Sequence, residues 1–435
     1  MRQSFLALPT ALLIAISVCG GKAGGETGSN VEKHWESSSD PVAQMWRRWQ
    51  TGQSMPDTSD PKKFVASVLR ELGIPVSSQT LVFSKTSLQN ALISPHTPRS
   101  LFYNEECYVG WAQGGLMELI GLDPEKGAQF YSLRVPYDSP GSRPELSATE
   151  TCFSCHESSR TDNVRGMLVR SVYVDSSGQP QFQEGSFLSS HESPLSERWG
   201  GWYVTGKHGK ERHMGNVVAQ MSGDHLILDR EAGANVLSLE RFFSTADYLA
   251  ATSDIVALMV LEHQCTMHNR LIDAGKSTRE ALLRQHDLQK AFGEPITDEP
   301  SGSALSVINS QVDKVLKCLL FAGEYTLQDK GVESSAAFQD AFRQNRKETK
   351  DGRSLKDFQL LTRLFKYRCS YMIYSKSFEA LPLALKKVLY QRLFNILTSR
   401  DASRDFAYLG ALERTHILEI LRETKPDLPN YWRKG

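Results

Sequence analysis

Short runs of alternating apolar and polar residues, separated by Gly and Pro, occupy the chain from about residue 62 to about residue 235. Alternation with a period of two is typical of half-buried β-strands. The clearest runs are 130–135 and 168–174, and the second is followed by the turn-forming sequence Asp175-Ser176-Ser177-Gly178. This part of the chain is therefore predicted to form short strands joined by turns.

The spacing of apolar residues changes near residue 239. Leucines recur at helical spacing on two long segments without internal proline, namely Leu258, Leu261 and Leu271, then Leu316, Leu319 and Leu320. Segments 355–374 and 383–397 are two more amphipathic helix candidates, and the polar stretch 326–353 is expected to be a mobile excursion between helices. The predicted fold class is α+β: a mixed N-terminal region of short strands and loops, followed by a mostly α-helical C-terminal region.

The amino terminus has the pattern of an export signal. Arg2 supplies a positive charge, and residues 5–18 form an uncharged, mostly apolar run that is too short to span a bilayer. A signal peptide is predicted over residues 1–23, and cleavage after Ala23 would release a soluble protein. Lipidation of Cys19 is the alternative, because Ile16-Ser17-Val18-Cys19 roughly resembles a bacterial lipobox. Both routes predict an exported protein, in the periplasm or the cell envelope.

Residues 24–61 are polar and rich in Ser, Gly and acidic side chains, so they are predicted to be a flexible linker. Trp46, Trp49 and the basic pair between them are expected to begin a short helix in this stretch.

Charge and length exclude some classes of protein. The 435 residues include 50 Lys and Arg and 50 Asp and Glu, so the net charge is zero. A dedicated nucleic-acid-binding protein needs a surplus of cations to displace counterions, so no nucleic-acid partner is expected. No run of about 18 apolar residues occurs, so no transmembrane span is expected in the mature chain.

One motif carries specific chemistry. Cys152-Phe153-Ser154-Cys155-His156 has the C-x-x-C-H spacing of a c-type haem attachment site. Two thiols three positions apart can each form a thioether with one of the two haem vinyl groups, and the adjacent imidazole then binds the iron. The motif predicts one covalent haem c, attached through Cys152 and Cys155, with His156 as the proximal iron ligand.

Three other interpretations of the cysteine pair stay open. It can be half of a zinc site, although no second C-x-x-C occurs and structural zinc takes four closed ligands. It can be a thioredoxin-like redox pair, although no βαβ pattern surrounds it. It can also be a plain disulfide.

The stretch from Thr151 to Asn216 resembles a group of exported bacterial cytochrome c domain-containing proteins. The matching segments within it are 152–156, 160–162, 166–172, 190–195 and 198–206, and further segments match at 94–99, 108–111, 261–264 and 368–375. The resemblance spans most of the mature chain and implies a haem and export, but no established reaction. Together with the change in periodicity near residue 239, the motif predicts a cytochrome c-like haem-binding region over 62–238 and a helical region over 239–435.

The sixth iron ligand decides between functions, because a second strong ligand suits electron transfer whereas an open position lets small molecules bind. Met214 is the first candidate for this distal position and His213 the alternative, and both lie in the Gly-rich segment 206–216. His208 and His191 are weaker candidates.

Other side chains have two interpretations each. The aromatic residues Trp199, Trp202 and Tyr203 either wall a haem pocket or pack in the core, and Arg160, Arg165 and Arg170 either pair with haem propionates or face solvent. His263 shares a helical face with Met259 and Met267, which favours a hydrogen-bonded core histidine. The remaining cysteines either form disulfides or stay as buried thiols: Cys107, Cys265, Cys318 and Cys369.

The sequence therefore predicts an exported monohaem c-type cytochrome that transfers electrons with a redox partner protein of unknown identity. A haem-dependent oxidoreductase of peroxidase-like type, or a haem-based sensor with an open sixth position, is the alternative.

Overall fold

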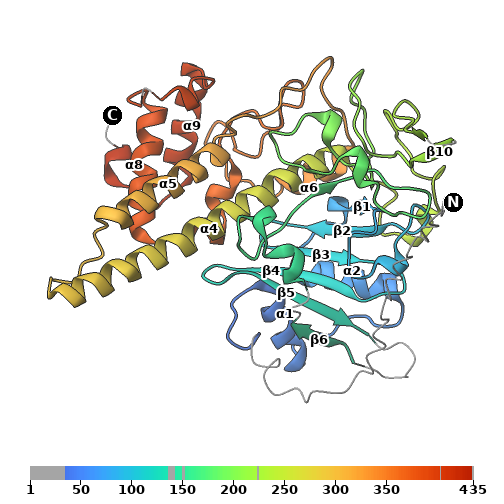
Figure 1. Cartoon of the computed structure of the whole chain (residues 1–435), viewed down its shortest axis with the longest axis horizontal. Helices are drawn as coiled ribbons and strands as arrows, with labels where there is room; N and C mark the ends of the chain where they lie inside the picture. Colours follow the sequence, from blue (N-terminus) through green and yellow to red (C-terminus); the bar gives the residue numbers. More distant parts are fainter. Residues whose placement is uncertain (1–34, 136–142, 149–151, 223–224, 402, 434–435) are drawn as a thin grey trace, which may run out of the picture.

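The computed structural model describes residues 35–135, 143–148, 152–222, 225–401 and 403–433 (Figure 1). The predicted signal peptide, Ala23 and Cys19 lie outside the described residues. An antiparallel sheet lies in the N-terminal half and helices dominate the C-terminal half, which confirms the α+β class.

The main sheet has seven strands in the order β6-β5-β4-β3-β2-β1-β9, and every neighbouring pair is antiparallel. Most of its strands follow one another along the chain as a meander. The bounds are β1 Thr80–Val82, β2 Arg99–Tyr103, β3 Cys107–Trp111, β4 Met117–Asp123, β5 Gly127–Arg134, β6 Glu145–Ala148 and β9 Trp202–Tyr203. The strand predicted at 130–135 is thus confirmed as β5, whereas within 168–174 only the two residues of β7 (Arg170–Ser171) form a strand.

Alternate side chains of the sheet enter two different cores. On β3, Val109 and Trp111 face helices α1 (Pro41–Gln50) and α2 (Pro61–Leu72), whereas Tyr108 faces α4 (Ile255–Phe292). Figure 1 shows the blue helices α1 and α2 on one side of the sheet and the long yellow helix α4 on the other. The central strands of the sheet are therefore buried on both faces, as the period of two in their side chains allows, whereas the edge strand β6 is largely exposed.

Helix α1 corrects the prediction of a flexible linker over residues 24–61 for the part that the structure describes, which begins at residue 35. Its Met45 and Trp49 are buried against the sheet, and Asp40 caps its first turn by accepting hydrogen bonds from the N–H groups of Val42 (2.8 Å) and Ala43 (3.1 Å). The polar composition misled the prediction because the few apolar residues of this stretch lie on one helical face and supply a core layer. The short helix expected around Trp46 and Trp49 is confirmed.

Replacing Asp40 by alanine is expected to lower the free energy of unfolding by about 3 kcal/mol, through loss of the cap and of a buried acceptor. The second carboxylate oxygen of Asp40 accepts hydrogen bonds from Tyr131 Oη (2.6 Å) and Ser38 Oγ (2.7 Å), and both donors lose that acceptor in the variant. Asp60→Ala is the matched control, because Asp60 caps α2 in the same way but is exposed. Urea unfolding measures both, and equal losses for the two variants would contradict the role given to Tyr131 and Ser38.

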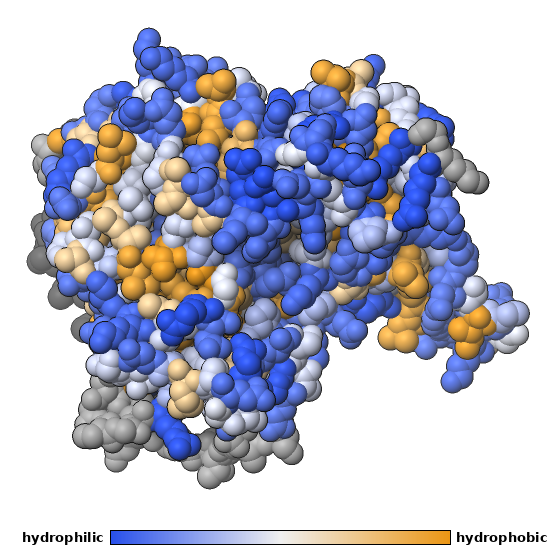
Figure 2. Space-filling model, turned by 180° about the vertical axis from the view of Figure 1, so that it is seen from behind, coloured by the Kyte–Doolittle hydropathy of each residue, from blue (hydrophilic) through white to orange (hydrophobic). Residues whose placement is uncertain are grey.

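The C-terminal helices pack around α4 and α5 (Gly302–Leu319), which form an antiparallel hairpin. Shorter helices follow, with bounds α6 Ala336–Arg343, α7 Lys376–Glu379, α8 Leu383–Leu397 and α9 Ala411–Thr424. The helices predicted from the leucines of 258–271 and 316–320 and from 383–397 are confirmed. The far end of the hairpin protrudes from the body and carries exposed apolar side chains (Figure 2), namely Leu283, Leu288, Phe292 and Ile296. Within the part of the chain that the structure describes, none of the helices is both long enough and apolar enough to cross a membrane.

The helix predicted over 355–374 is wrong: this segment is irregular except for a 3-10 turn at Tyr371–Tyr374. Side chains from elsewhere accept the N–H hydrogen bonds that a helix would use internally. Glu324 Oε1 accepts from Leu364 N (3.0 Å) and Glu413 Oε1 accepts from Arg368 N (3.0 Å). Side chains distant in the sequence therefore accept the backbone hydrogen bonds that carbonyl groups of the same helix would otherwise accept.

The mobile excursion predicted over 326–353 is also wrong, because it contains α6. Phe338 and Phe342 lie four residues apart on one face of that helix and are buried. Their rings contact Tyr103 of β2 and Tyr371 respectively. One hydrophobic cluster thus contains residues of the sheet and of the C-terminal helices, so the two predicted regions share a core.

Candidate haem attachment site

The C-x-x-C-H motif forms a single helical turn on the face of the sheet that α4 also covers. Cys152 N-terminally flanks α3 (Phe153–His156), and its carbonyl accepts hydrogen bonds from Cys155 N (3.2 Å) and His156 N (3.0 Å). Residues three apart on such a turn lie on the same side of the helix. Cys152 is half-buried and Cys155 is exposed, so the two thiols are neighbours at the surface.

The His156 ring is held in one orientation. Its Nδ1 lies 2.8 Å from the carbonyl oxygen of Gly166, and its ring packs 5.0 Å from that of Phe130 on β5. A carbonyl oxygen only accepts, so the proton is on Nδ1 and Nε2 carries the lone pair. Burial lowers the pKa of His156, and the neutral imidazole is the form that binds metals.

The loop from Glu157 to Arg165 folds back on His156 and is held by hydrogen bonds. Gly166 N donates to His156 O (2.8 Å), and a capping box links Ser158 with Thr161. Helix α4 holds the far end of the loop, because the side-chain amide of Asn269 bonds both Met167 N (2.9 Å) and Met167 O (2.7 Å). A Cβ at Gly166 would collide with Asn269 Oδ1, so a larger residue here would displace the Asn269 side chain from Met167.

Two arginines and uncovered apolar groups lie close to the motif. The Arg165 guanidinium stacks 3.9 Å above the Phe153 ring and pairs with Glu157 (3.1 Å). Burial is the main cause that lowers the pKa of the Arg170 guanidinium. The charge of Arg160 lowers this pKa further, and Cys155 acts in the opposite direction. β7 pairs with β8 (Phe187–Leu188) in a two-stranded ribbon, and Arg170 lies opposite the exposed Leu188 in that pair. Arg170 also lies 4.9 Å from the ring of the exposed Phe182.

Met214 lies behind the same ribbon. It is buried, its sulfur accepts a hydrogen bond from Ser171 Oγ (3.4 Å), and it packs in a small cluster with Tyr173 and Val217. Cys152 instead packs against the large core cluster. Met214 therefore contacts Ser171, the residue after Arg170, but it does not belong to the hydrophobic cluster against which Cys152 packs.

The histidines of the same segment are buried. The His213 ring lies 5.3 Å from Trp199 and 4.5 Å from His208, and burial followed by the charge of His208 holds the pKa of His213 well below its usual value. His208 already uses both ring nitrogens, since Nδ1 contacts Glu211 O (2.9 Å) and Nε2 accepts from Asn235 N (2.9 Å). In this arrangement His208 has no nitrogen left for iron, whereas His213 Nδ1 lacks a hydrogen-bond partner.

The nearby aromatic residues Trp199, Trp202 and Tyr203 are all buried in the core. Trp202 Nε1 donates to Arg170 O (2.7 Å), which ties the β9 strand to the ribbon beside the motif. Cys107, Cys265, Cys318 and Cys369 are buried thiols without disulfides.

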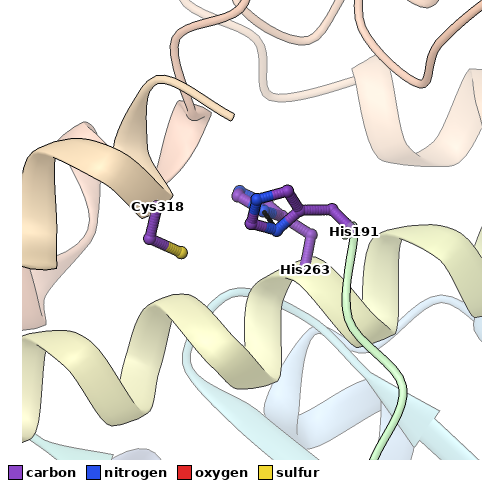
Figure 3. A group of neighbouring side chains, drawn as sticks. All are labelled: His191, His263 and Cys318. Carbon is purple, nitrogen blue, oxygen red and sulfur yellow. Dashed lines mark hydrogen bonds between the residues drawn. The ribbon is translucent and has the colours of Figure 1, made fainter. Parts of the chain in front are cut away.

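One group of side chains was not anticipated from the sequence. His191 was a candidate distal ligand and His263 an expected hydrogen-bonded core residue, but the structure places both beside Cys318 (Figure 3). His263 is buried and hydrogen-bonded as predicted, with Nε2 2.7 Å from Ser370 Oγ. Burial lowers the pKa of His191 to about 4 and that of His263 well below its usual value. No local spacing joins these residues, because they come from three distant segments.

A scan against protein-family models and searches of curated proteins and of solved structures found no match to this chain. The resemblance to exported cytochrome c domain proteins therefore stays a prediction, and the function is inferred from the geometry of the chain itself.

Proposed function

We propose that this chain is an exported c-type cytochrome that holds one haem through Cys152 and Cys155, with His156 as proximal iron ligand, and that it transfers electrons to or from a partner protein. When bound, the haem supplies an iron centre that cycles between ferrous and ferric states. The hydrogen bond from His156 Nδ1 to the Gly166 carbonyl carries the proposal. This bond leaves Nε2 as the ligand atom, as the outer partners of metal-bound histidines do.

The surroundings of the motif support a large, anionic, apolar cofactor. Arg165 and Arg170 offer guanidinium groups that suit the carboxylates of haem propionates. Phe182 and Leu188 expose apolar surface beside Arg170, and burying such surface under a flat cofactor is favourable. The loop from Glu157 to Arg165 leads to Gly166, whose carbonyl accepts the His156 hydrogen bond. This bond fixes the orientation of the imidazole before the haem is attached.

In this proposal Met214 is the distal ligand, and the thioether sulfur has a second lone pair besides the one that Ser171 Oγ uses. His213 is the alternative distal ligand. A haem-dependent oxidoreductase or sensor with an open sixth position is the second candidate function. The location of Met214 in a different cluster from Cys152 favours that second candidate.

Absorption spectra of the protein, exported from a host with haem-attachment machinery, test both candidates. We expect a Soret band that stays with the polypeptide after denaturation, and a low-spin ferrous form that does not bind carbon monoxide. Met214→Ala is then expected to open the sixth position and allow carbon monoxide to bind, because a strong ligand is lost. Met117→Ala, on the opposite face of the sheet, is the matched control and should stay inert.

The other outcomes are equally informative. A high-spin wild-type protein that binds carbon monoxide would replace electron transfer by the second candidate function. A carbon-monoxide-inert Met214→Ala variant would move the distal position to another residue, and His213→Ala would be measured next. The absence of a Soret band, with a control cytochrome processed normally, would overturn both functions.

A further inference from the structure

His191, His263 and Cys318 meet in a buried cluster that the proposed haem function does not use. Their ligand atoms all lie within 4.8 Å of one another. The exposed fractions of the three residues are 3%, 0% and 5% respectively. His191 lies on the loop before Arg198, His263 in α4, and Cys318 in the last turn of α5. Figure 3 shows the two imidazoles side by side, with the thiol on the neighbouring helix.

The separation of the two imidazoles fits coordination better than hydrogen bonding. Nδ1 of His263 lies 3.4 Å from Nδ1 of His191, which is longer than the usual range of about 2.7–3.2 Å for a hydrogen bond from nitrogen. Two nitrogen ligands of a tetrahedral zinc ion, with bonds of about 2.0–2.1 Å, lie about 3.4 Å apart. Nitrogen and sulfur ligands of such an ion lie about 3.6 Å apart, so the Cys318 sulfur reaches its place by moving about 1 Å.

The surroundings hold the imidazoles as a metal site would. Ser370 Oγ bonds His263 Nε2, which is the outer contact that commonly fixes the orientation of a metal-binding histidine. The Phe321 ring stacks 4.1 Å from the His263 ring and lies edge-on to that of His191. Phe321 adopts a left-handed backbone conformation (φ of 58°) directly after the C-cap of α5, where such a conformation commonly ends a helix. The remaining nitrogen of His191, Nε2, is buried and has no hydrogen-bond partner.

The donor set selects the kind of ion. Two imidazoles and one thiolate favour zinc or copper over calcium and magnesium, which prefer oxygen ligands. We propose that His191, His263 and Cys318 bind one transition-metal ion, zinc or copper, in a buried site separate from the haem. Both imidazoles bind through lone pairs, the Cys318 thiol loses its proton to solvent as the metal–sulfur bond forms, and one coordination position stays open.

Along α4, the proposed metal site adjoins the loop from Glu157 to Arg165 that follows the C-x-x-C-H motif. Asn269, which holds that loop through Met167, is six residues after His263, and this separation is about 9 Å along a helix axis. Arg270 of the same helix also pairs with Asp162 of that loop, with 2.7 Å between Nη1 and Oδ1. Metal binding would therefore link α4, α5 and the loop that carries His191. These three segments lie beside the Glu157–Arg165 loop that positions His156.

Metal analysis of the purified, exported full-length protein tests the site. Zinc, copper and iron are counted separately after the protein is offered zinc or copper and then passed over a chelating resin. We expect about one zinc or copper ion per chain, and X-ray absorption at that metal's edge with one sulfur and two imidazole nitrogens. Cys318→Ser is expected to lower the zinc or copper content at least tenfold with iron unchanged, and Cys369→Ser, another buried thiol, to leave it unchanged.

A second pair of variants guards against loss of folding as the explanation. His263→Gln is expected to lose the metal, whereas His268→Gln, an equally buried histidine on α4, is expected to retain it. The metal content of the wild-type protein tests the site even if the His263 and Cys318 variants do not fold. No retained zinc or copper, or a metal-edge spectrum without sulfur, would overturn the site. Iron content reports on the haem independently, so failure of one proposal does not imply failure of the other.

Discussion

Replacing both Cys152 and Cys155 by alanine is expected to abolish all haem that remains with the polypeptide after denaturation. Each thiol supplies one of the two thioether bonds, so without them the haem is held by non-covalent contacts alone and is extracted on unfolding. Each single variant is expected to keep one thioether and a shifted absorption spectrum. Haem staining of denaturing gels and intact-protein mass spectrometry measure the result, since covalent attachment adds the mass of the cofactor.

Cys107→Ala is the matched control, because Cys107 is a buried thiol on the opposite face of the sheet from the motif. It should retain the covalent haem in full. Circular dichroism distinguishes loss of attachment from loss of folding, and the double variant is expected to fold because Cys155 is exposed and Cys152 is half-buried. Haem that survives denaturation in the double variant would show that other residues attach it. A wild-type protein without haem, but with oxidised Cys152 and Cys155, would favour a disulfide.

Arg198→Met is expected to lower the free energy of unfolding by about 3–5 kcal/mol, because it leaves a buried carboxylate without its partner. The Arg198 and Glu262 side chains are 2% and 0% exposed, and Arg198 Nη1 lies 2.9 Å from Glu262 Oε2. The same guanidinium donates to the carbonyls of Ser193 (2.7 Å) and His191 (3.2 Å). The variant thus removes three interactions from one buried centre.

The loss should depend on pH. Burial raises the pKa of Glu262 to about 7 although the Arg198 charge opposes this, and without Arg198 the pKa is expected to rise further. The carboxyl group in the unfolded chain has a pKa of about 4.3. A carboxyl group whose folded pKa is raised loses stability as pH rises from its unfolded pKa to its folded pKa. Both proteins share this loss up to about pH 7, so the additional destabilisation by Arg198→Met grows above about pH 7, where the wild-type carboxyl ionises and that of the variant does not.

Two controls accompany this measurement. Adding Glu262→Leu to Arg198→Met is expected to recover most of the stability, because the stranded charge is removed. Lys207→Met breaks an exposed ion pair with Glu333 of the same length (2.9 Å), and should cost less than about 1 kcal/mol. Urea unfolding at pH 5 and pH 8 compares them. Equal losses for Arg198→Met and Lys207→Met would show that the buried pair does not have the assigned role.

Local patterns were sufficient where one periodicity extended over many residues. The leucine spacing in α4 and α5 predicted both helices, and the alternation around Phe130 predicted β5. The prediction failed at 355–374, where Glu324 and Glu413 accept backbone hydrogen bonds that the sequence pattern assigned to a helix. The short helix around Trp46 and Trp49 was expected, but its burial was not. Its apolar residues are sparse in a polar stretch, and they are buried only because the sheet packs against them.

The candidate haem attachment site also depends partly on local sequence and partly on tertiary packing. The C-x-x-C-H spacing alone predicts two neighbouring thiols and an adjacent imidazole, because one helical turn places them together whatever surrounds it. The contact between His156 and Gly166 needs the loop between them to fold back under Asn269, and this depends on the packing of α4. Which side chain would face the iron of the proposed haem likewise depends on how the Met214 segment packs, not on its distance along the chain.

The attachment chemistry predicted at Cys152 and Cys155 and the succession of strands and then helices could be inferred from the amino-acid order alone, because both depend on residues close together in the chain. The cluster of His191, His263 and Cys318 could not. His191 and His263, whose rings are in contact, are 72 residues apart in the sequence. Distant segments come together in a packed core because the apolar surface on each of them is buried there. Local spacing in the sequence does not predict which distant segments will meet.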